Sequence, residues 1–301
     1  MSSGSQKLER ENEAWRRPAS INALWEGAAA IAPEALEYDA SPGWWALLAE
    51  LGVTLLVTRE YEHLAMALSA PGGTPRQSWM PVPHPSGIAF DARRGTVFLA
   101  STRNPNVMYE LEPVRALVRH GNDGTPEEML DALVPARASF LPGCLYLHDL
   151  ATMGGSVYAA AAGINAIVRF KQGRYEPVWW PASIDRAKGP AFSRNGIQLN
   201  GIAAGSSLEA SYFTASAEKI GKRYPGDPEF PVDRRGVLFS GTTREPIARG
   251  LTRPHSPRRM RGGVWVCDSG YGRLVVVRDG KPETVAALPG WTRGLCLHGG
   301  I

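Results

Sequence analysis

Hydrophobic and polar residues alternate in short runs over most of this chain. From about residue 53 onward, runs of β-branched and small apolar residues are separated by clusters of Gly, Pro, Asn and Asp, a pattern typical of strands joined by turns. Examples are VTLLVT (53–58), TVFLAST (96–102), SVYAAAAG (156–163), GVLFS (236–240) and VWVCD (264–268). No long helical pattern separates these runs, which disfavours a fold of alternating strands and helices.

The first 50 residues have a different pattern. The stretches INALWEGAAAIAPEALE (21–37) and WWALLAEL (44–51) are rich in Ala or Leu and place apolar residues at roughly helical spacing. We therefore expect a helical N-terminal extension over residues 1–50 and an all-β domain over residues 51–301.

The strand pattern also repeats along the chain. Each module opens on a polar residue, continues into a small-apolar strand of the G-I-A type, and then passes through a Gly- or Ser-containing turn into a second strand. The module starts are spaced by 62, 52, 55 and 38 residues, and they are Ser86, His148, Asn200, His255 and Arg293. Propeller blades occupy about 40–50 residues, so irregular spacing of this size predicts a β-propeller with loop insertions.

The number of modules, together with the segment 53–70, approaches six. We predict a six-bladed β-propeller whose last blade is incomplete, because the module at Arg293 stops after its first strand at Ile301. An unpaired strand edge is a liability for a sheet, so we expect the natural polypeptide to continue beyond Ile301.

Several phrases together resemble a known family. They occur in order as LHDLA (147–151), LNGIA (199–203), GLTRPHSPR (250–258), VWVCDSGYGRL (264–274) and LPGWTRGL (288–295). They resemble a bacterial family of conserved hypothetical propeller-like proteins of unknown function, whose chains usually continue past the TRGL phrase. More distantly, VCDSGYGRLVVV is similar to NHL-type and gluconolactonase-like propellers, although their metal-binding residues do not map onto this sequence. The resemblance implies a fold and brings no activity with it.

The module starts supply the candidate site residues. In a propeller the first strand of each blade lines the central channel, so residues at equivalent starts form a ring near one mouth. We predict His148 and His255 as catalytic acid/base groups, with Ser86, Asn200 and Arg293 as substrate-binding groups. An Arg at this position suits a carboxylate or phosphate, which favours a small anionic ligand.

A metal site is a second hypothesis for the same ring. His84 lies two residues before Ser86, and together with His148 and His255 it offers three imidazoles that can hold a divalent ion such as zinc. The structural alternative is that each histidine hydrogen-bonds the backbone of a neighbouring blade, and that Arg293 pairs with Asp149 or Asp268. We expect both aspartates to be structural.

Charge and composition limit the partners and the cellular compartment that we expect for this protein. The net charge is +4 and the one dense basic cluster, Arg258, Arg259 and Arg261, is interpreted as a solvated loop, so no nucleic-acid partner is expected. The three cysteines form no C-x-x-C pair, and neither a signal peptide nor an 18-residue apolar span is present in the sequence. We expect a cytoplasmic protein without a membrane partner.

Two function hypotheses remain. The P-loop, H-E-x-x-H, G-x-S-x-G and EF-hand patterns are absent from the sequence, which disfavours the corresponding activities. The first hypothesis is a channel-mouth site acting as a hydrolase, lyase or isomerase, with or without metal assistance. The alternative is a non-catalytic propeller scaffold that binds a protein or peptide.

Overall fold

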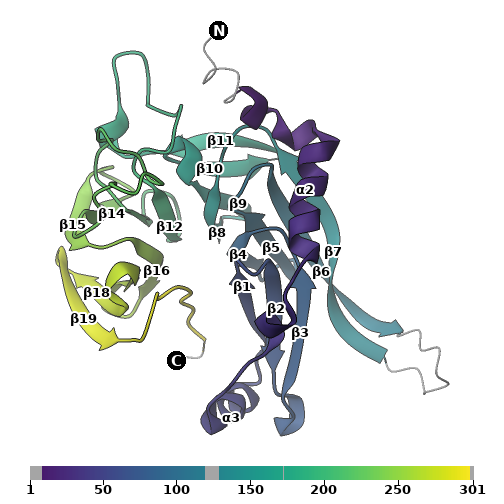
Figure 1. The fold of residues 1–301 in the computed structure, drawn as a ribbon. Coiled ribbons are helices and arrows are strands. Elements are labelled where there is room, and N and C mark those ends of the chain that lie inside the picture. Colours follow the sequence, from purple (N-terminus) through teal and green to yellow (C-terminus); the bar gives the residue numbers. More distant parts are fainter. Residues whose placement is uncertain (1–8, 119–128, 172, 299–301) are drawn as a thin grey trace.

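The computed structural model describes residues 9–118, 129–171 and 173–298. In this part of the chain, five antiparallel sheets follow one another (Figure 1). Within each sheet, every strand pairs with the strands that precede and follow it in the sequence. The first sheet has three strands, β1 (Leu55–Arg59), β2 (Leu64–Ser69) and β3 (Arg76–Pro81). The second has four, namely β4 (Pro85–Asp91), β5 (Thr96–Ser101), β6 (Asn106–Val118) and β7 (Met129–Leu141).

The remaining three sheets also have four strands each. The third contains β8 (Leu147–Met153), β9 (Ser156–Ala161), β10 (Ala166–Lys171) and β11 (Arg174–Trp179). The fourth contains β12 (Leu199–Ala203), β13 (Tyr212–Ala215), β14 (Gly236–Ser240) and β15 (Pro246–Leu251). The fifth contains β16 (Pro254–Met260), β17 (Gly263–Asp268), β18 (Arg273–Arg278) and β19 (Lys281–Ala287). The predicted all-β propeller architecture is therefore confirmed.

Short helices precede the sheets, as the sequence pattern indicates. They are η1 (Ala14–Arg16), α2 (Pro18–Ala29), η2 (Pro33–Leu36) and α3 (Pro42–Leu51). Helix α2 packs on β6 through Trp25, whose ring meets that of Tyr109 edge-on at 6.1 Å. None of the described helices combines the length and the apolar character that crossing a membrane requires.

Apolar side chains fill the space between consecutive sheets. A cluster containing Trp179, Phe213 and Phe239 lies between the third and fourth sheets, and Trp179 is 5% exposed. Similar clusters lie at the other three junctions between neighbouring sheets. Burial of strand faces against the next sheet is the main stabilising contribution in such an arrangement.

The inner strands approach one another very closely. Gly87 on β4 lies against the backbone of Asp149 and Leu150 on β8, and a Cβ atom on Gly87 would lie 2.8 Å from these backbone atoms. Gly201 on β12 lies against the ring of Pro257 on β16 in the same way. Glycine is required at these two positions because the neighbouring backbone at Gly87, and the Pro257 ring at Gly201, occupy the space of a side chain.

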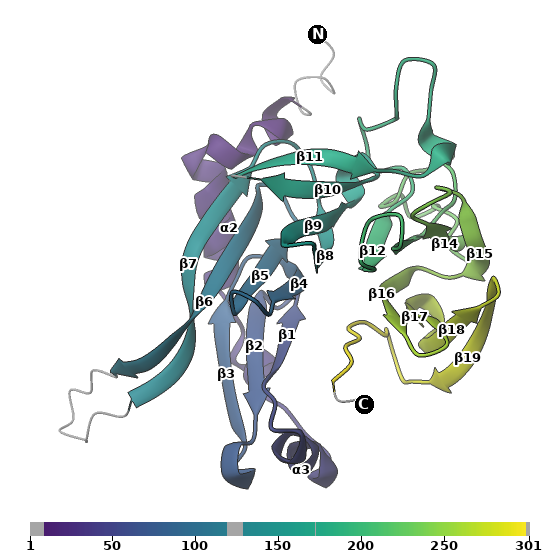
Figure 2. The same ribbon diagram turned by 180° about the vertical axis from the view of Figure 1, so that it is seen from behind.

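The predicted number of blades is wrong. The described residues form five sheets, and the segment 292–298, which was expected to begin a sixth blade, forms no strand. This segment lies between the last sheet and the first (Figures 1 and 2). Hydrogen bonds outside any strand ladder hold it there, since Gly294 N–H donates to Ser256 Oγ and Arg293 contacts Ser86. The expectation that the chain continues beyond Ile301 stays a prediction.

The close approach of β12 and β16 generates a stability prediction. A Gly201→Ala substitution places Cβ 2.3 Å from Cδ of Pro257 and 3.0 Å from Oγ1 of Thr214. Neither neighbour is a flexible side-chain end, so we expect a loss of about 1–3 kcal/mol in the free energy of unfolding. Chemical denaturation of both proteins measures this loss.

Gly221→Ala is the matched control for this experiment. A Cβ atom at Gly221 meets only the carbonyl oxygen of Arg223, at 3.9 Å, so its effect should stay within about 0.5 kcal/mol. Equal unfolding free energies for the two variants would contradict the packing of β12 against β16.

Candidate functional site

The candidate site lies where the inner strands of four successive sheets begin. Each of these strands carries a β-bulge at its start, where the pairing register with the next strand shifts. The bulges lie between Pro85 and Ile88, Leu147 and Leu150, Leu199 and Gly201, and His255 and Arg258. A bulge leaves residues out of the ladder and redirects their side chains, and bulges are frequent beside functional sites.

A left-handed residue precedes each bulge. The φ angles are 43° at His84, 49° at Tyr146, 52° at Gln198 and 47° at Arg253, a conformation uncommon outside glycine. These residues stand two positions before Ser86, His148, Asn200 and His255, respectively. The same backbone feature at the same offset confirms that the predicted module starts are structurally equivalent.

Ser86, His148 and Arg293 are in direct contact. Ser86 Oγ donates to the carbonyl oxygen of His148 at 2.9 Å, and Arg293 Nη2 donates to Ser86 Oγ at 3.1 Å. Ser86 thus connects the second sheet to the third and also fixes the guanidinium.

Asn200 and His255 lie on the following two blades. Asn200 Nδ2 donates to Ser216 Oγ at 3.0 Å and to the carbonyl oxygen of Pro254 at 3.1 Å. His255 is 5% exposed, and its Nδ1 lies 2.8 Å from the carbonyl oxygen of Arg253. A carbonyl can only accept, so Nδ1 carries the proton. The bond is local, to the residue that precedes its own strand, so the expected alternative of a hydrogen bond to the backbone of a neighbouring blade is wrong for His255.

Two charged residues at the mouth were missed by the sequence analysis. Glu60, in the turn after β1, lies 3.3 Å from Arg293 Nη1 and accepts a hydrogen bond from Thr102. Arg103, after β5, lies 3.9 Å from Glu60. Arg103 lies in the turn after the second strand of its sheet, at the same end as the module starts, so the repeat pattern could have identified it. Glu60 follows β1, the first strand of its three-stranded sheet, and the repeat pattern does not point to it. The predicted pairing of Arg293 with Asp149 or Asp268 is wrong, because its carboxylate partner is Glu60.

The two aspartates are structural, as expected. Asp149 accepts from Leu150 N–H and Ile202 N–H and pairs with Arg258 at 3.2 Å. Asp268 accepts from Thr252 N–H and pairs with Arg273. The interpretation of Arg258 and Arg259 as a solvated loop is wrong, since both lie on the inner strand β16.

Comparison with protein families identifies the chain. A family model described as "Domain of unknown function (DUF4915)" matches residues 42–301. The chain belongs to this family. The predicted resemblance to a family of unknown function is thereby confirmed, whereas the distant relation to NHL-type and gluconolactonase-like propellers stays a prediction.

Solved structures similar to this DUF4915 chain are distant. Virginiamycin B lyase from Staphylococcus aureus is 15% identical with a TM-score of 0.45, over 79% of this chain and 67% of that one. The PQQ-bound aldose sugar dehydrogenase from Streptomyces coelicolor is 20% identical with a TM-score of 0.43, over 77% and 78%. The Cps50 (Swd1) β-propeller domain from Myceliophteria thermophila is 10% identical with a TM-score of 0.41, over 75% and 65%. No curated protein matches the chain. At these values we draw no argument about activity from the similar structures.

Burial and positive charge keep the histidines of this DUF4915 chain neutral. Burial, together with the charge of Arg293, lowers the pKa of His148 to about 4. The pKa of His255 is also lowered well below its usual range, by burial first and then by Arg293 and His148. Burial and the neighbouring His63 and Arg103 lower the pKa of His84 to about 4. Glu60 remains ionised because the hydrogen bond from Thr102 and the nearby cations outweigh its burial and lower its pKa.

The residues present do not fit the predicted metal site. Within the described ranges, no three His, Cys, Asp or Glu side chains lie close enough together to hold a metal ion. The ring of His84 instead lies 4.2 Å from that of His63, whose Nδ1 accepts the His84 backbone N–H. The structure therefore places His148 and His255 near Arg293 in the circle of residues at the channel mouth. His84 lies instead on the side of Glu60 and Arg103.

The low pKa of His148 generates a prediction about stability and pH. An unfolded chain protonates this histidine near pH 6.5 and the folded chain near pH 4, so folding is favoured above pH 6.5 and loses stability as the pH falls towards 4. Replacing His148 by Asn removes the contribution of this histidine to the pH dependence of the unfolding free energy, which amounts to about 2 kcal/mol between pH 7.5 and pH 5. We expect the variant to lose less unfolding free energy over that interval than the wild type.

The exposed His298 supplies the control. Its Asn variant should retain the wild-type pH dependence when urea unfolding is measured at pH 7.5 and pH 5. If His148→Asn also retained it, the burial of the His148 imidazole would be refuted.

Proposed function

We propose that the channel mouth binds a small anionic molecule, with Arg293 as the principal charged contact. The observation that carries the proposal is the charge balance at this mouth. Two guanidinium groups, those of Arg293 and Arg103, converge on the single carboxylate of Glu60 at 3.3 and 3.9 Å. Since the neighbouring histidines are neutral, one positive charge is left for a ligand to compensate.

The exposure of these groups supports a ligand-accessible arrangement. The side chain of Arg293 is 30% exposed, whereas that of Glu60 is 10% exposed. An incoming carboxylate or phosphate can therefore reach the guanidinium while Glu60 continues to hold it from behind. Arg presents donors in a planar fork, which matches the oxygens of such an anion.

Unsatisfied polar atoms at the ring support hydrogen bonding to the same ligand. His148 Nδ1 and Asn200 Oδ1 are buried without a hydrogen-bond partner among the described residues. Buried polar atoms normally have partners. A ligand hydroxyl next to the anionic group would supply one, and we place His148, Asn200 and Ser86 as the orienting groups.

Binding is better supported than acid/base catalysis at neutral pH. A histidine with a pKa of about 4 is a weak base at pH 7. An anion on Arg293 would reduce the positive field at His148 and raise its pKa towards the working range. A hydrolase, lyase or isomerase activity with His148 as the base therefore depends on the bound ligand.

An Arg293→Gln substitution tests the proposed site. Calorimetric titration of the wild type with succinate and with inorganic phosphate should give saturable binding, and the variant should bind at least about tenfold more weakly because a charged hydrogen bond is lost. The substitution retains a side-chain amide donor for Ser86, which limits the disturbance of the fold.

Arg278→Gln is the matched control. Arg278 lies on β18 and pairs at 2.8 Å with Glu283 on β19, so this variant loses the same charge elsewhere and should bind as the wild type does. Equal weakening in both variants would show an effect of net charge alone. Absence of any saturable anion binding to the wild type would refute the proposal and favour the protein-binding scaffold.

A further inference from the structure

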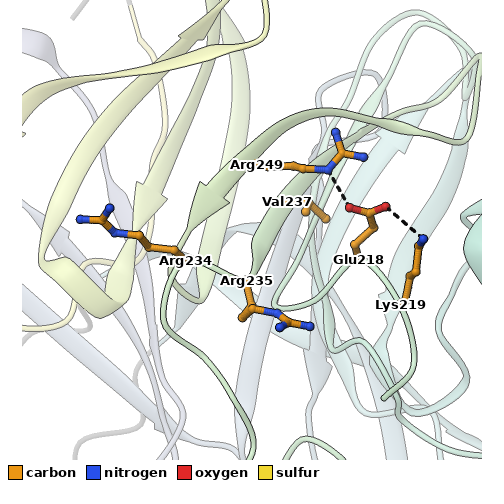
Figure 3. A pocket seen from close by; sticks show the side chains of 6 residues that line it. All are labelled: Glu218, Lys219, Arg234, Arg235, Val237 and Arg249. Atoms are coloured by element: carbon orange, nitrogen blue, oxygen red, sulfur yellow. Dashed lines mark hydrogen bonds and ion pairs between the residues drawn. The ribbon is translucent and has the colours of Figure 1, made fainter.

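A second basic site lies on the fourth sheet, at the same end of the strands as the channel mouth. A hollow of about 290 Å³ is lined by Glu218, Lys219, Arg234, Arg235, Val237 and Arg249 (Figure 3). Glu218 and Lys219 follow the end of β13, Arg235 directly precedes β14, and Arg249 pairs with Val237 across β14 and β15. The fold thus gathers these side chains from two strands, β14 and β15, and from the two ends of the segment that connects β13 to β14.

One carboxylate serves three cations in this hollow. Arg249 Nε donates to Glu218 Oε2 at 2.7 Å, and Lys219 Nζ lies 3.9 Å from Glu218 Oε1. The hydrogen bond from Arg249 is the main reason that the pKa of Glu218 is lowered, and the charge of Arg235 also contributes. The side chain of Arg235 has no hydrogen bond or ion pair within the described part of the chain.

The fourth cation belongs to a different contact. Figure 3 shows the side chain of Arg234 directed away from the other five residues. The hydroxyl of Tyr271 first, and then the charge of Asp233, raise the pKa of Arg234. Among the residues that line the hollow, Lys219, Arg235 and Arg249 share the carboxylate of Glu218, which leaves an excess of two positive charges in the lining. The charge of Glu245, which lies outside the lining, also acts on Arg249.

We infer that this hollow binds the phosphate group of a small phosphate monoester. A phosphate dianion carries close to the charge that balances the excess, and guanidinium and ammonium donors are its usual partners in proteins. The volume lies just below the range of about 300–1,000 Å³ typical of small-molecule sites, so the ligand is small. Glu218 holds the cations together in the absence of ligand and competes with the phosphate for Arg249.

Because Glu218 competes with the phosphate, replacing it should raise the affinity of the hollow for a phosphate monoester, and this increase tests the inference. In Glu218→Gln the competing carboxylate is gone, and we expect glycerol 3-phosphate to bind about threefold more tightly than to the wild type. In Arg235→Gln, which breaks no hydrogen bond or ion pair within the described part of the chain, we expect binding about fivefold weaker. The wild-type affinity should be of the order of 1 mM, because the site is open to solvent. Calorimetric titration with glycerol 3-phosphate at constant ionic strength measures the affinity of the wild type and of both variants.

The stoichiometry separates this site from the one proposed at the channel mouth. If both exist, inorganic phosphate binds the wild type at two sites, and Arg293→Gln and Arg235→Gln each weaken binding at one of them. If the channel-mouth proposal fails, the wild type binds one phosphate, whose affinity Arg235→Gln lowers and Arg293→Gln leaves unchanged.

Three results would overturn the inference. One is a Glu218→Gln variant that binds glycerol 3-phosphate no more tightly than the wild type. Another is an Arg235→Gln variant with wild-type affinity. The third is a loss in Arg278→Gln equal to that in Arg235→Gln, since Arg278 lies outside the hollow and such a loss would report only net charge.

Discussion

Close contact between the inner strands is the constraint on which the rest of this structure depends. Gly87 lies against the backbone of β8 and Gly201 against the Pro257 ring of β16, where a side chain would not fit. Side chains then join successive inner strands, since Ser86 bonds to His148 and Asn200 to Pro254. Blades that meet this closely need their polar backbone groups satisfied across the junction, and the residues at the module starts do this.

The same geometry determines the electrostatics of the channel mouth. Residues at a bulge do not pair fully in their own sheet, so their side chains are available to the neighbouring blade or to a ligand. Burial among the converging strands removes water from the histidines, and Arg293 opposes their protonation further. The mouth therefore combines neutral imidazoles with guanidinium groups, which suits an anion and does not suit a metal cation.

Both proposed anion sites lie at the same end of the strands, and the side chains that this end presents determine their charge. The start of the inner strand and the turn after the second strand lie at this end, where Arg103 and Glu218 are found. Glu60, in the turn after β1, lies at this end as well, beside Arg103 and Arg293. Both sites use one carboxylate to hold more than one cation. Such a carboxylate keeps like charges together in the free protein and leaves positive charge for a ligand.

The sequence by itself determined the class of the fold and the equivalence of the module starts, because strand periodicity and turn residues are local properties. It identified Ser86, His148, Asn200, His255 and Arg293 as equivalent, and the recurring bulges and left-handed residues at the first four confirm the alignment there. Only the tertiary structure decided the number of sheets, because a strand exists only when its edge finds a partner, and 292–298 finds none. It also decided that Arg293 pairs with Glu60, because two residues 233 positions apart meet only when the last sheet and the first are brought together.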